Sequence, residues 1–272
     1  MTTPRFSLII PTLNEEKFLP KLLESIADQT EKSFEVIVVD GASKDNTVKI
    51  ARSFDKKIPI RVITCDHARL PMQRNRGAAQ ARGLWLLFID ADGVLLPYCI
   101  ERLDIFIRLG VSQLVTAWGK PDSEVTQDSV STLFYNMTLE GGLLFKRPIA
   151  PGPFTAIARS AFEAIGGYDE SLEFGEDQNL SQRLADHGVS LAILRETLYV
   201  WSMRRFRAQG RAWSAQVYIR SALRVLFTGK NYTHMPGYIM GGHLYDKKKP
   251  IKRSRLLDYE KKLKQLMGEL FQ

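Results

Sequence analysis

WLLFIDADGVLL, residues 85–96, joins a buried strand to a pair of acids, and the expected architecture of the chain follows from it. Its first five residues, Trp85 to Ile89, form an apolar run that suits a strand and is too short for a typical helix. Continuous apolar strands are typical of parallel sheets, which bind ligands beyond the carboxyl ends of their strands. The run ends in DADG, residues 90–93, so two carboxylates are expected at that edge.

The paired acids, Asp90 and Asp92, would repel each other unless a cation or solvent lies between them. Oxygen ligands of this kind suit Mg²⁺ or Mn²⁺, which keep several waters and bridge to substrate phosphates. A solvated Asp-Gly turn is the alternative for this stretch taken alone, because short turns favour the same residues. The neighbouring segments have to decide between the two interpretations.

Composition limits the class of protein. The 272 residues are 44% hydrophobic and 25% charged, as in an ordinary globular protein of one large domain, or of a domain with an extension. The net charge of +8 favours an anionic partner: nucleotide phosphate, nucleic acid or an acidic membrane surface. Cys65 and Cys99 form no C-x-x-C pair, which argues against a zinc site or a disulfide framework.

The sequence also predicts where the protein resides. Its first residues lack the basic-then-apolar pattern of a signal peptide, and no apolar run approaches the roughly 20 residues that span a bilayer. We therefore expect a cytoplasmic protein that is soluble or bound peripherally at the cytoplasmic face of a membrane.

The first hundred residues alternate between strand and helix patterns. The expected order is strand 6–10, helix 14–26, strand 34–39, helix from 45, strand 60–64, helix 73–81 and strand 85–89. This alternation predicts βαβ units and a mostly parallel sheet. The acid-bearing loops 11–15, 40–43 and 90–93 would then meet at one edge of the sheet.

The second half is less regular. We expect helices at 98–109, 160–165 and 176–187, short strands at 113–117, 155–158, 191–194 and 197–200, a surface loop at 119–131, and an ambiguous segment at 132–144. From Trp201 the chain becomes basic and aromatic, with further helices expected from 212 to 227 and at the end. We therefore divide the chain into a domain of residues 1–205, with halves 1–117 and 118–205, and a basic helical C-terminal extension, 206–272.

Two common phosphate-binding motifs are absent from the sequence. No G-x-G-x-x-G follows the first strand, and no G-x-x-x-x-G-K-[ST] occurs. A phosphate-bearing ligand would therefore be held by a metal ion and by basic side chains.

Six motifs follow each other in order along the chain: PTLNE at 11–15, VDGASKDNT at 39–47, RNRG at 74–77, DADG at 90–93, GGYD at 166–169 and GED at 175–177. Together they resemble the GT-A glycosyltransferases of family 2, over roughly residues 5 to 205. The resemblance implies an α/β fold of the GT-A type, with a mostly parallel central sheet flanked by helices and a Rossmann-like nucleotide-binding half. It also implies inverting transfer of a sugar from a nucleotide-diphospho-sugar to an acceptor hydroxyl or phosphate, in cell-envelope, glycolipid or polysaccharide synthesis.

The resemblance assigns the donor site residue by residue. Pro11, Glu15 and Asp40 match positions that grip the nucleoside, and Arg74 and Asn75 match an R-N-x-G motif near the nucleotide diphosphate. Structural alternatives stay open: Asp40 also fits a turn before glycine, Glu15 a helix N-terminus, and the arginine and asparagine a solvated helical face.

The DADG and GED motifs carry the chemistry that the resemblance implies. Asp90, Ala91 and Asp92 match the DxD motif, with Asp92 as the expected direct ligand of Mg²⁺ or Mn²⁺ and Asp90 nearer the ribose or a metal-bound water. Asp177 matches the catalytic base, and Glu176 is expected to support it at the acceptor. An acid in the first turn of a helix is the structural alternative for Asp177.

The basic segment departs from the pattern of the family. Many relatives carry Q-x-x-R-W where this chain has Arg204 and Arg205, so we do not expect a processive polysaccharide synthase. The two arginines would hold the diphosphate of the donor or of a lipid-linked acceptor, or else form a solvated basic face. His234 and His243 are candidates to complete the metal shell, and ordinary structural histidines are the alternative.

Partners other than the donor are less defined. The basic aromatic segment and the lysines near residue 248 permit contact with anionic lipid headgroups, or form a solvated tail. Nucleic acid is not expected, because no recognised binding module accompanies the charge. The sugar, the nucleotide base and the acceptor, whether lipid-linked or glycan, are left open.

Two other functions were weighed. A sugar-1-phosphate nucleotidyltransferase has a related sheet, but its first loop is usually glycine-rich and basic, unlike PTLNE at 11–15. A catalytically silent carbohydrate- or membrane-binding relative would not need both metal acids and a base, and the sequence contains all three.

Overall fold

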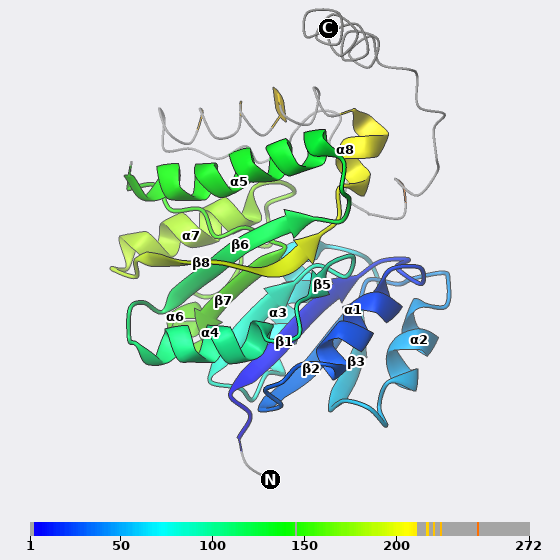
Figure 1. Ribbon diagram of the computed structural model, residues 1–272. Helices are drawn as coiled ribbons and strands as arrows, with labels where there is room; N and C mark the ends of the chain where they lie inside the picture. Colours follow the sequence, from blue (N-terminus) through cyan, green and yellow to red (C-terminus); the bar gives the residue numbers. More distant parts are fainter. Residues whose placement is uncertain are drawn as a thin grey trace, which may run out of the picture.

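The computed structural model of the protein describes residues 3–144 and 146–210, together with the isolated positions 216–217, 220, 224 and 244. One eight-stranded sheet with the strand order β3-β2-β1-β4-β7-β6-β8-β5 runs through the described part. Helices α1, α2 and α4 lie in front of this sheet and α3 and α6 behind it, as Figure 1 shows. The predicted α/β class, with a mixed and mostly parallel sheet flanked by helices, is confirmed.

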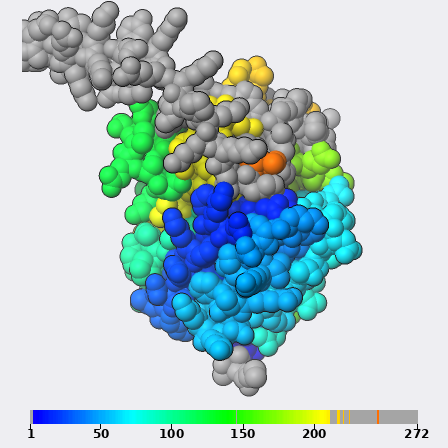
Figure 2. Space-filling view, turned by 90° about the vertical axis from the view of Figure 1, so that its right-hand side faces the viewer, coloured from blue at the N-terminus to red at the C-terminus, as the bar shows by residue number. Residues whose placement is uncertain are grey.

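The N-terminal half is built from βαβ units, as the alternating pattern predicts. Its elements are β1 (Phe6–Thr12), α1 (Leu19–Ala27), β2 (Phe34–Asp40), α2 (Thr47–Ser53), β3 (Ile60–Thr64), α3 (Leu70–Ala79) and β4 (Trp85–Ile89). Strands β3, β2, β1 and β4 pair in parallel. Every residue of β1, β2 and β4 is buried, which explains their continuous apolar sequences. Seen from the side, the blue and cyan side chains of this half form one closely packed surface (Figure 2).

The C-terminal half continues the same sheet with reversed strands. Its elements are β5 (Val94–Leu95), α4 (Cys99–Arg108), β6 (Leu114–Pro121), α5 (Thr126–Leu144), β7 (Phe154–Ala158), α6 (Arg159–Ala164), α7 (Glu176–Asp186), β8 (Leu191–Trp201) and α8 (Arg204–Gln209). Strand β7 joins the halves, because it pairs antiparallel with both β4 and β6. Strand β8 runs parallel to β6, and β5 pairs antiparallel with β8.

Two sequence-based expectations in this half are wrong. The loop expected at 119–131 is the end of β6 followed by the start of α5, and the two short strands expected at 191–194 and 197–200 are one strand, β8. The register between β6 and β8 shifts near Trp118, so a polar interruption in sequence does not interrupt the pairing. Residues 132–144, which the sequence left ambiguous, belong to α5, and the helix does not break at Gly141. Because α5 packs on β6 and β8, it does not depend on local helix propensity alone.

The first loop also differs from expectation. Helix α1 begins at Leu19, and Asn14 does not cap it. Asn14 instead has a positive φ of 54°, and its Oδ1 accepts a hydrogen bond from the Lys44 amide at 2.7 Å. The Asn14 amide donates to Ser43 Oγ at 2.8 Å. These bonds join the loops after β1 and β2, so the predicted meeting of these two loops at one sheet edge is confirmed.

The predicted C-terminal extension falls largely outside the described residues, including the helix expected from 212 to 227 and the final helix. Within the part of the chain that the structure describes, no helix has both the length and the apolar character needed to cross a bilayer. The boundaries proposed at 117 and 205 stay predictions.

The glycine of the RNRG motif sets the approach of α3 to the sheet. A Cβ on Gly77 would lie 2.5 Å from Ile9 Cγ2 and 3.1 Å from Val39 Cγ2, both buried side chains of the sheet. Gly141 of α5, in contrast, has open space around the position of a Cβ. The first glycine is therefore required by close contact and the second is not.

We expect Gly77→Ala to lower the free energy of unfolding by about 1–3 kcal/mol, because the added methyl overpacks the contact between α3 and the sheet. Gly141→Ala should raise it by about 0.5–1 kcal/mol, because alanine is the better helix former. Urea denaturation of both variants beside the wild type measures the difference. Equal effects of the two substitutions would contradict this account of α3.

Candidate active site

Asp40 lies at the end of β2, at the edge where the candidate site residues meet. It ends β2 opposite Thr12 of β1, and its side chain is buried. Its Oδ1 accepts a hydrogen bond from Thr12 Oγ1 at 3.0 Å, and its Oδ2 accepts one from the Ser43 amide at 2.9 Å. Pro11 is buried beside it in β1. Asp40 thus fixes the turn that follows β2, whatever it also binds.

Arg204 of α8 bridges two acids that are distant in sequence. Its Nη2 lies 2.6 Å from Glu15 Oε1 and its Nε lies 2.9 Å from Asp92 Oδ2. Its guanidinium also stands over the ring of Phe18, 4.4 Å from the centroid. Burial raises the pKa of Asp92, with Asp90 adding to the rise, while Arg204 and, more weakly, Arg205 oppose it. The charge of Asp92, whose side chain is 20% exposed, therefore depends on its cationic neighbours.

Strand pairing explains why Arg204 reaches Asp92. Val94 of β5 pairs antiparallel with Val200 of β8. Val94 directly follows the DADG turn, and Val200 lies four residues before Arg204, the first residue of α8. A two-residue strand therefore brings the DADG loop to the start of α8.

Arg74 of α3 is the second bridging cation, and its side chain is only 1% exposed. Its Nη1 lies 3.0 Å from Glu176 Oε1, and its Nη2 lies 3.1 Å from Asp90 Oδ1 and 3.2 Å from the carbonyl oxygen of Gly152. The guanidinium carbon of Arg74 lies over the ring of Tyr168, 5.2 Å from the ring centroid. Burial alone would lower the pKa of Arg74, but its anionic surroundings raise it, so the cation is held firmly.

Asn75 follows Arg74 but turns to a different partner. Its Nδ2 donates to the carbonyl oxygen of Tyr168 at 2.9 Å, and its Oδ1 accepts from the Tyr168 amide at 2.8 Å. A Cβ on Gly167, which has a φ of +74°, would lie 2.7 Å from this Oδ1. Asn75 therefore holds the GGYD loop, and its assignment to the diphosphate stays a prediction.

Glu176 and Asp177 open α7 after Gly175, whose φ of 73° turns the chain into the helix. Asp177 Oδ2 accepts from the Gly152 amide at 3.0 Å and its Oδ1 from the Gln178 amide at 2.8 Å. Burial raises the pKa of Glu176 to about 7, helped by Asp177 and opposed by Arg74. Burial also raises the pKa of Asp177, whereas the hydrogen bond from the Gly152 amide and the charge of Arg74 lower it.

The model of one family covers more than half of the chain: Glycosyl transferase family 2 matches residues 7–166. The chain belongs to glycosyl transferase family 2. Its described fold is also that of solved glycosyltransferases. A mannosyltransferase from Pyrobaculum calidifontis, PcManGT, in complex with GDP-Man and Mn²⁺, superposes with a TM-score of 0.64 at 22% identity, over 85% of this chain and 67% of that one. Residues 1–349 of Staphylococcus aureus TarS in complex with UDP-GlcNAc superpose with a TM-score of 0.60 at 24% identity, over 73% of this chain and 58% of that one.

Curated relatives are similar over parts of this family 2 chain. A PGL/p-HBAD biosynthesis glycosyltransferase of Mycobacterium bovis is 44% identical over 97 residues, 35% of this chain and 38% of the relative. The poly(ribitol-phosphate) beta-N-acetylglucosaminyltransferase TarS of Staphylococcus aureus is 28% identical over 209 residues, 74% of this chain and 36% of the relative. The chain thus spans less than two fifths of the length of either relative.

Asp90 and Asp92 of the DADG motif are the residues that could hold a divalent ion. The side chains of Asp90 and Asp92 are 35% and 20% exposed, so both carboxylates are within reach of solvent. No group of three or more His, Cys, Asp and Glu side chains that could hold a metal ion occurs among the described residues. Two carboxylates completed by water and substrate phosphates are a usual donor set for Mg²⁺, so this pair suits an ion that binds together with a diphosphate.

The tertiary structure thus gathers most predicted residues of this family 2 site into two clusters. The Arg74 cluster holds Asp90 and Glu176, with Asp177 alongside, and the Arg204 cluster holds Glu15 and Asp92. Buried Ala91 links the two acids of the DxD motif, and half-buried Arg205 influences Asp92. His234 and His243 lie outside the described residues.

Sequence reasoning missed three partners in these clusters. Gly152 contributes both a carbonyl group to Arg74 and an amide to Asp177, and Tyr168 supports Arg74 with its ring. The GGYD motif hinted at Tyr168, but nothing in the sequence marked Gly152. Phe18, beneath Arg204, looked like one more apolar helix position.

We expect Arg74→Lys to lower the free energy of unfolding by about 3–5 kcal/mol, because one ammonium cannot meet Asp90, Glu176 and Gly152 together and leaves buried charge unpaired. Arg195→Lys is the control. Its guanidinium is exposed and binds Glu140 at 2.9 and 2.8 Å, so that substitution should leave the free energy of unfolding nearly unchanged. Urea denaturation compares the two, and a small effect at Arg74 would show that its partners are hydrated.

Proposed function

We propose that this chain is a metal-dependent, inverting glycosyltransferase that moves a sugar from a nucleotide-diphospho-sugar to an acceptor hydroxyl or phosphate, in the synthesis of cell-envelope glycans or glycolipids. Family membership supports the reaction class. The related structures with UDP-GlcNAc and with GDP-Man and Mn²⁺ support the donor class and the metal. The relatives named for PGL/p-HBAD biosynthesis and for poly(ribitol-phosphate) support an envelope role.

One observation carries this proposal: the donor acids and the acceptor acids share one electrostatic environment. Arg74 pairs with Asp90 on one side and with Glu176 on the other. Asp90 in turn raises the pKa of both Glu176 and Asp177. A diphosphate near Asp90 and a base at Asp177 are therefore close enough to serve the two ends of one displacement.

In this proposal the donor lies along the edge formed by the first loops. Pro11, Glu15 and Asp40 hold the nucleoside, and Arg204 and Arg205 hold the diphosphate. A guanidinium fork suits phosphate oxygens, and Arg204 is already oriented by carboxylates at 2.6 and 2.9 Å. Asp92, supported by Asp90, would hold Mg²⁺ or Mn²⁺, which when bound supplies Lewis-acid stabilisation of charge on the leaving nucleotide diphosphate.

Asp177 is the proposed base. In an inverting transfer, a carboxylate takes the proton of the acceptor hydroxyl as its oxygen attacks the anomeric carbon and the bond to the diphosphate breaks. Asp177 is half-buried, whereas Glu176 is buried against Arg74, so Asp177 is the acid that an acceptor reaches. Its bonds from the Gly152 and Gln178 amides fix its orientation. Glu176 keeps Arg74 in place beside it.

We expect Asp177→Asn to bind UDP-sugar or GDP-sugar in the presence of Mn²⁺ about as the wild type does, and to lose transfer by about 10²–10⁴-fold, because the base contributes to the chemical step. Asp92→Asn should lose metal-dependent donor binding. Calorimetric titration and a transfer assay separate the two effects. Asp186→Asn, at the exposed end of the same helix, is the control and should behave as the wild type.

Normal transfer by Asp177→Asn would refute the base assignment. A wild-type protein that binds nucleotide diphosphates tightly but neither transfers nor hydrolyses any donor would support the silent relative instead. A thermal-shift panel of nucleotide-sugars with and without Mn²⁺ identifies the donor to use, since a ligand that binds the native state raises the melting temperature.

We expect kcat/KM to rise with pH through an apparent pKa near 7. The base acts when deprotonated. The two acids keep their protons to a higher pH than free carboxyl groups do, because burial raises the pKa of Glu176 to about 7 and also raises the pKa of Asp177. The value belongs to the pair. Glu176→Gln should move the rise to lower pH, because removing one charge lowers the pKa of the other acid. A profile that is flat from pH 5 to 8 would contradict this.

A further inference from the structure

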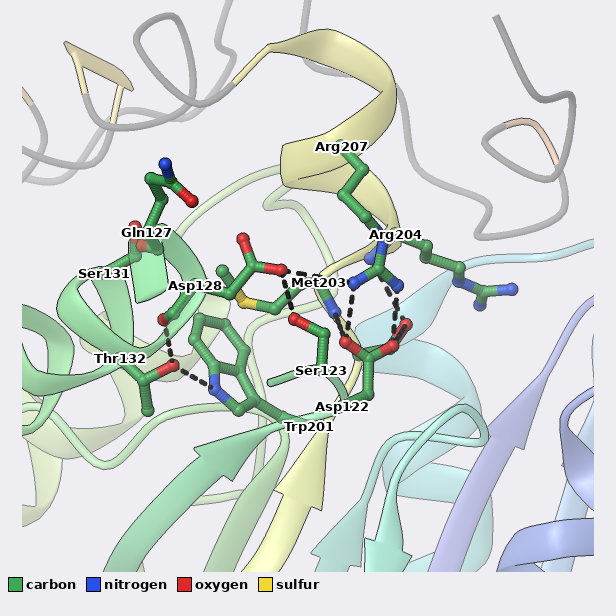
Figure 3. Close-up of polar contacts among 11 residues, drawn as sticks. Asp122, Ser123, Gln127, Asp128, Ser131, Thr132, Trp201, Met203, Arg204 and Arg207 are labelled. Atoms are coloured by element: carbon green, nitrogen blue, oxygen red, sulfur yellow. Dashed lines mark hydrogen bonds and ion pairs between the residues drawn. The ribbon is translucent and has the colours of Figure 1, made fainter. Parts of the chain in front are cut away.

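Helix α8, which carries Arg204, is held by two sets of ion pairs. Arg204 pairs with Glu15 and Asp92. Arg207 donates from Nη1 and Nη2 to the two carboxylate oxygens of Asp122, at 2.7 Å each (Figure 3). The Met203 amide donates to the same carboxylate at 3.1 Å. We call Asp122, Met203 and Arg207 the Asp122 clamp.

The clamp is attached to the junction of β6 and α5. Asp122 directly follows β6, and behind it lies Asp128 in the first turn of α5, with a fully buried side chain. Asp128 Oδ2 accepts from Ser123 Oγ at 2.5 Å and lies 3.5 Å from Arg207 Nη1. Thr132 Oγ1 donates to the carbonyl oxygen of Asp128 at 2.9 Å. Arg207 therefore binds to the junction of β6 and α5 and not to a single surface acid.

The clamp holds both ends of the turn that carries Arg204. Met203 precedes Arg204 and forms the N-cap of α8, and Arg207 lies one helical turn further on. In Figure 3 the guanidinium of Arg207 points to Asp122, while that of Arg204 points away from it. A shift of α8 on the Asp122 side would consequently move Arg204 relative to the DxD motif.

We propose that Asp122 is a positioning residue for the donor site: through Arg207 and the Met203 amide it fixes α8, and thereby sets the place of Arg204 between Glu15 and Asp92. This inference rests on the proposed function, in which Arg204 meets the donor diphosphate. Asp122 itself does not touch the donor. Its loss would leave Arg204 charged and present but no longer oriented, which weakens diphosphate binding before it affects the acceptor or the base.

A matched pair of variants tests the proposal in the full chain. Asp122→Asn removes the charge of a carboxylate with 27% exposure that binds an arginine through two hydrogen bonds. Glu140→Gln removes the charge of one with 28% exposure that binds Arg195 in the same way. Calorimetry measures the affinity for UDP and for GDP with MnCl₂. We expect Asp122→Asn to bind about tenfold more weakly than the wild type, which is within the range of coupling in one ion-pair network. Glu140→Gln should bind as tightly as the wild type.

A double-mutant cycle distinguishes positioning from simple loss of stability. In the Arg204→Lys background, Asp122→Asn should weaken nucleotide binding by about twofold or less, because its effect passes through the Arg204 guanidinium. Arg207→Gln removes the other partner of the same pair and should reproduce the effect of Asp122→Asn. In steady-state assays, Asp122→Asn and Arg207→Gln should each raise the KM for the donor and leave kcat nearly unchanged.

The outcomes separate the two proposals. Wild-type protein that binds neither UDP nor GDP would overturn the proposed function, and this inference with it. Wild-type binding with equal affinities for Asp122→Asn and Glu140→Gln would overturn the inference alone. So would a full, additive effect of Asp122→Asn in the Arg204→Lys background, because a purely structural role predicts additivity. Melting temperatures, measured in parallel, confirm that each variant is folded at the assay temperature.

Discussion

The buried guanidinium of Arg74 is the interaction on which the site depends. A charge in the protein interior is costly unless it is paired and hydrogen-bonded. Arg74 meets this condition by contacting Asp90 after β4, Glu176 at the start of α7 and the Gly152 carbonyl before β7. These partners come from both halves of the sheet. One cation therefore ties Asp90 of the DADG loop to Glu176 at the start of α7.

Arg204 repeats the same arrangement on the other side of the DxD motif. It satisfies Glu15 and Asp92, so each acid of the motif already has a cationic partner before any ligand binds. In the proposed function, a diphosphate would offer these arginines phosphate oxygens, which suit a guanidinium fork as well as carboxylate oxygens do. The two acids are therefore held by the chain's own cations, whatever ligand the site takes.

The acids of α7 show how one environment separates two carboxyl groups. Glu176 is buried against Arg74, and Asp177 is half-buried and oriented by two backbone amides. Desolvation raises the pKa of both, so the pair holds protons nearer neutral pH than free acids do. That is the range in which a general base works best.

The sequence by itself determined the α/β class, the order of the first strands and the family. Continuous apolar runs and motif order are local properties, and they predicted β1, β2 and β4 and singled out most of the residues that meet in the two arginine clusters. It could not reveal that α5 continues through Gly141, that Asn75 faces the Tyr168 loop, or that Arg204 and Asp92 pair. The first of these depends on contact with the sheet. The second and third depend on loop closure and on the pairing of β5 with β8. Only the tertiary structure decided them, because a side chain's partner across the fold is set by strand register and burial, and these join residues that are far apart in the chain.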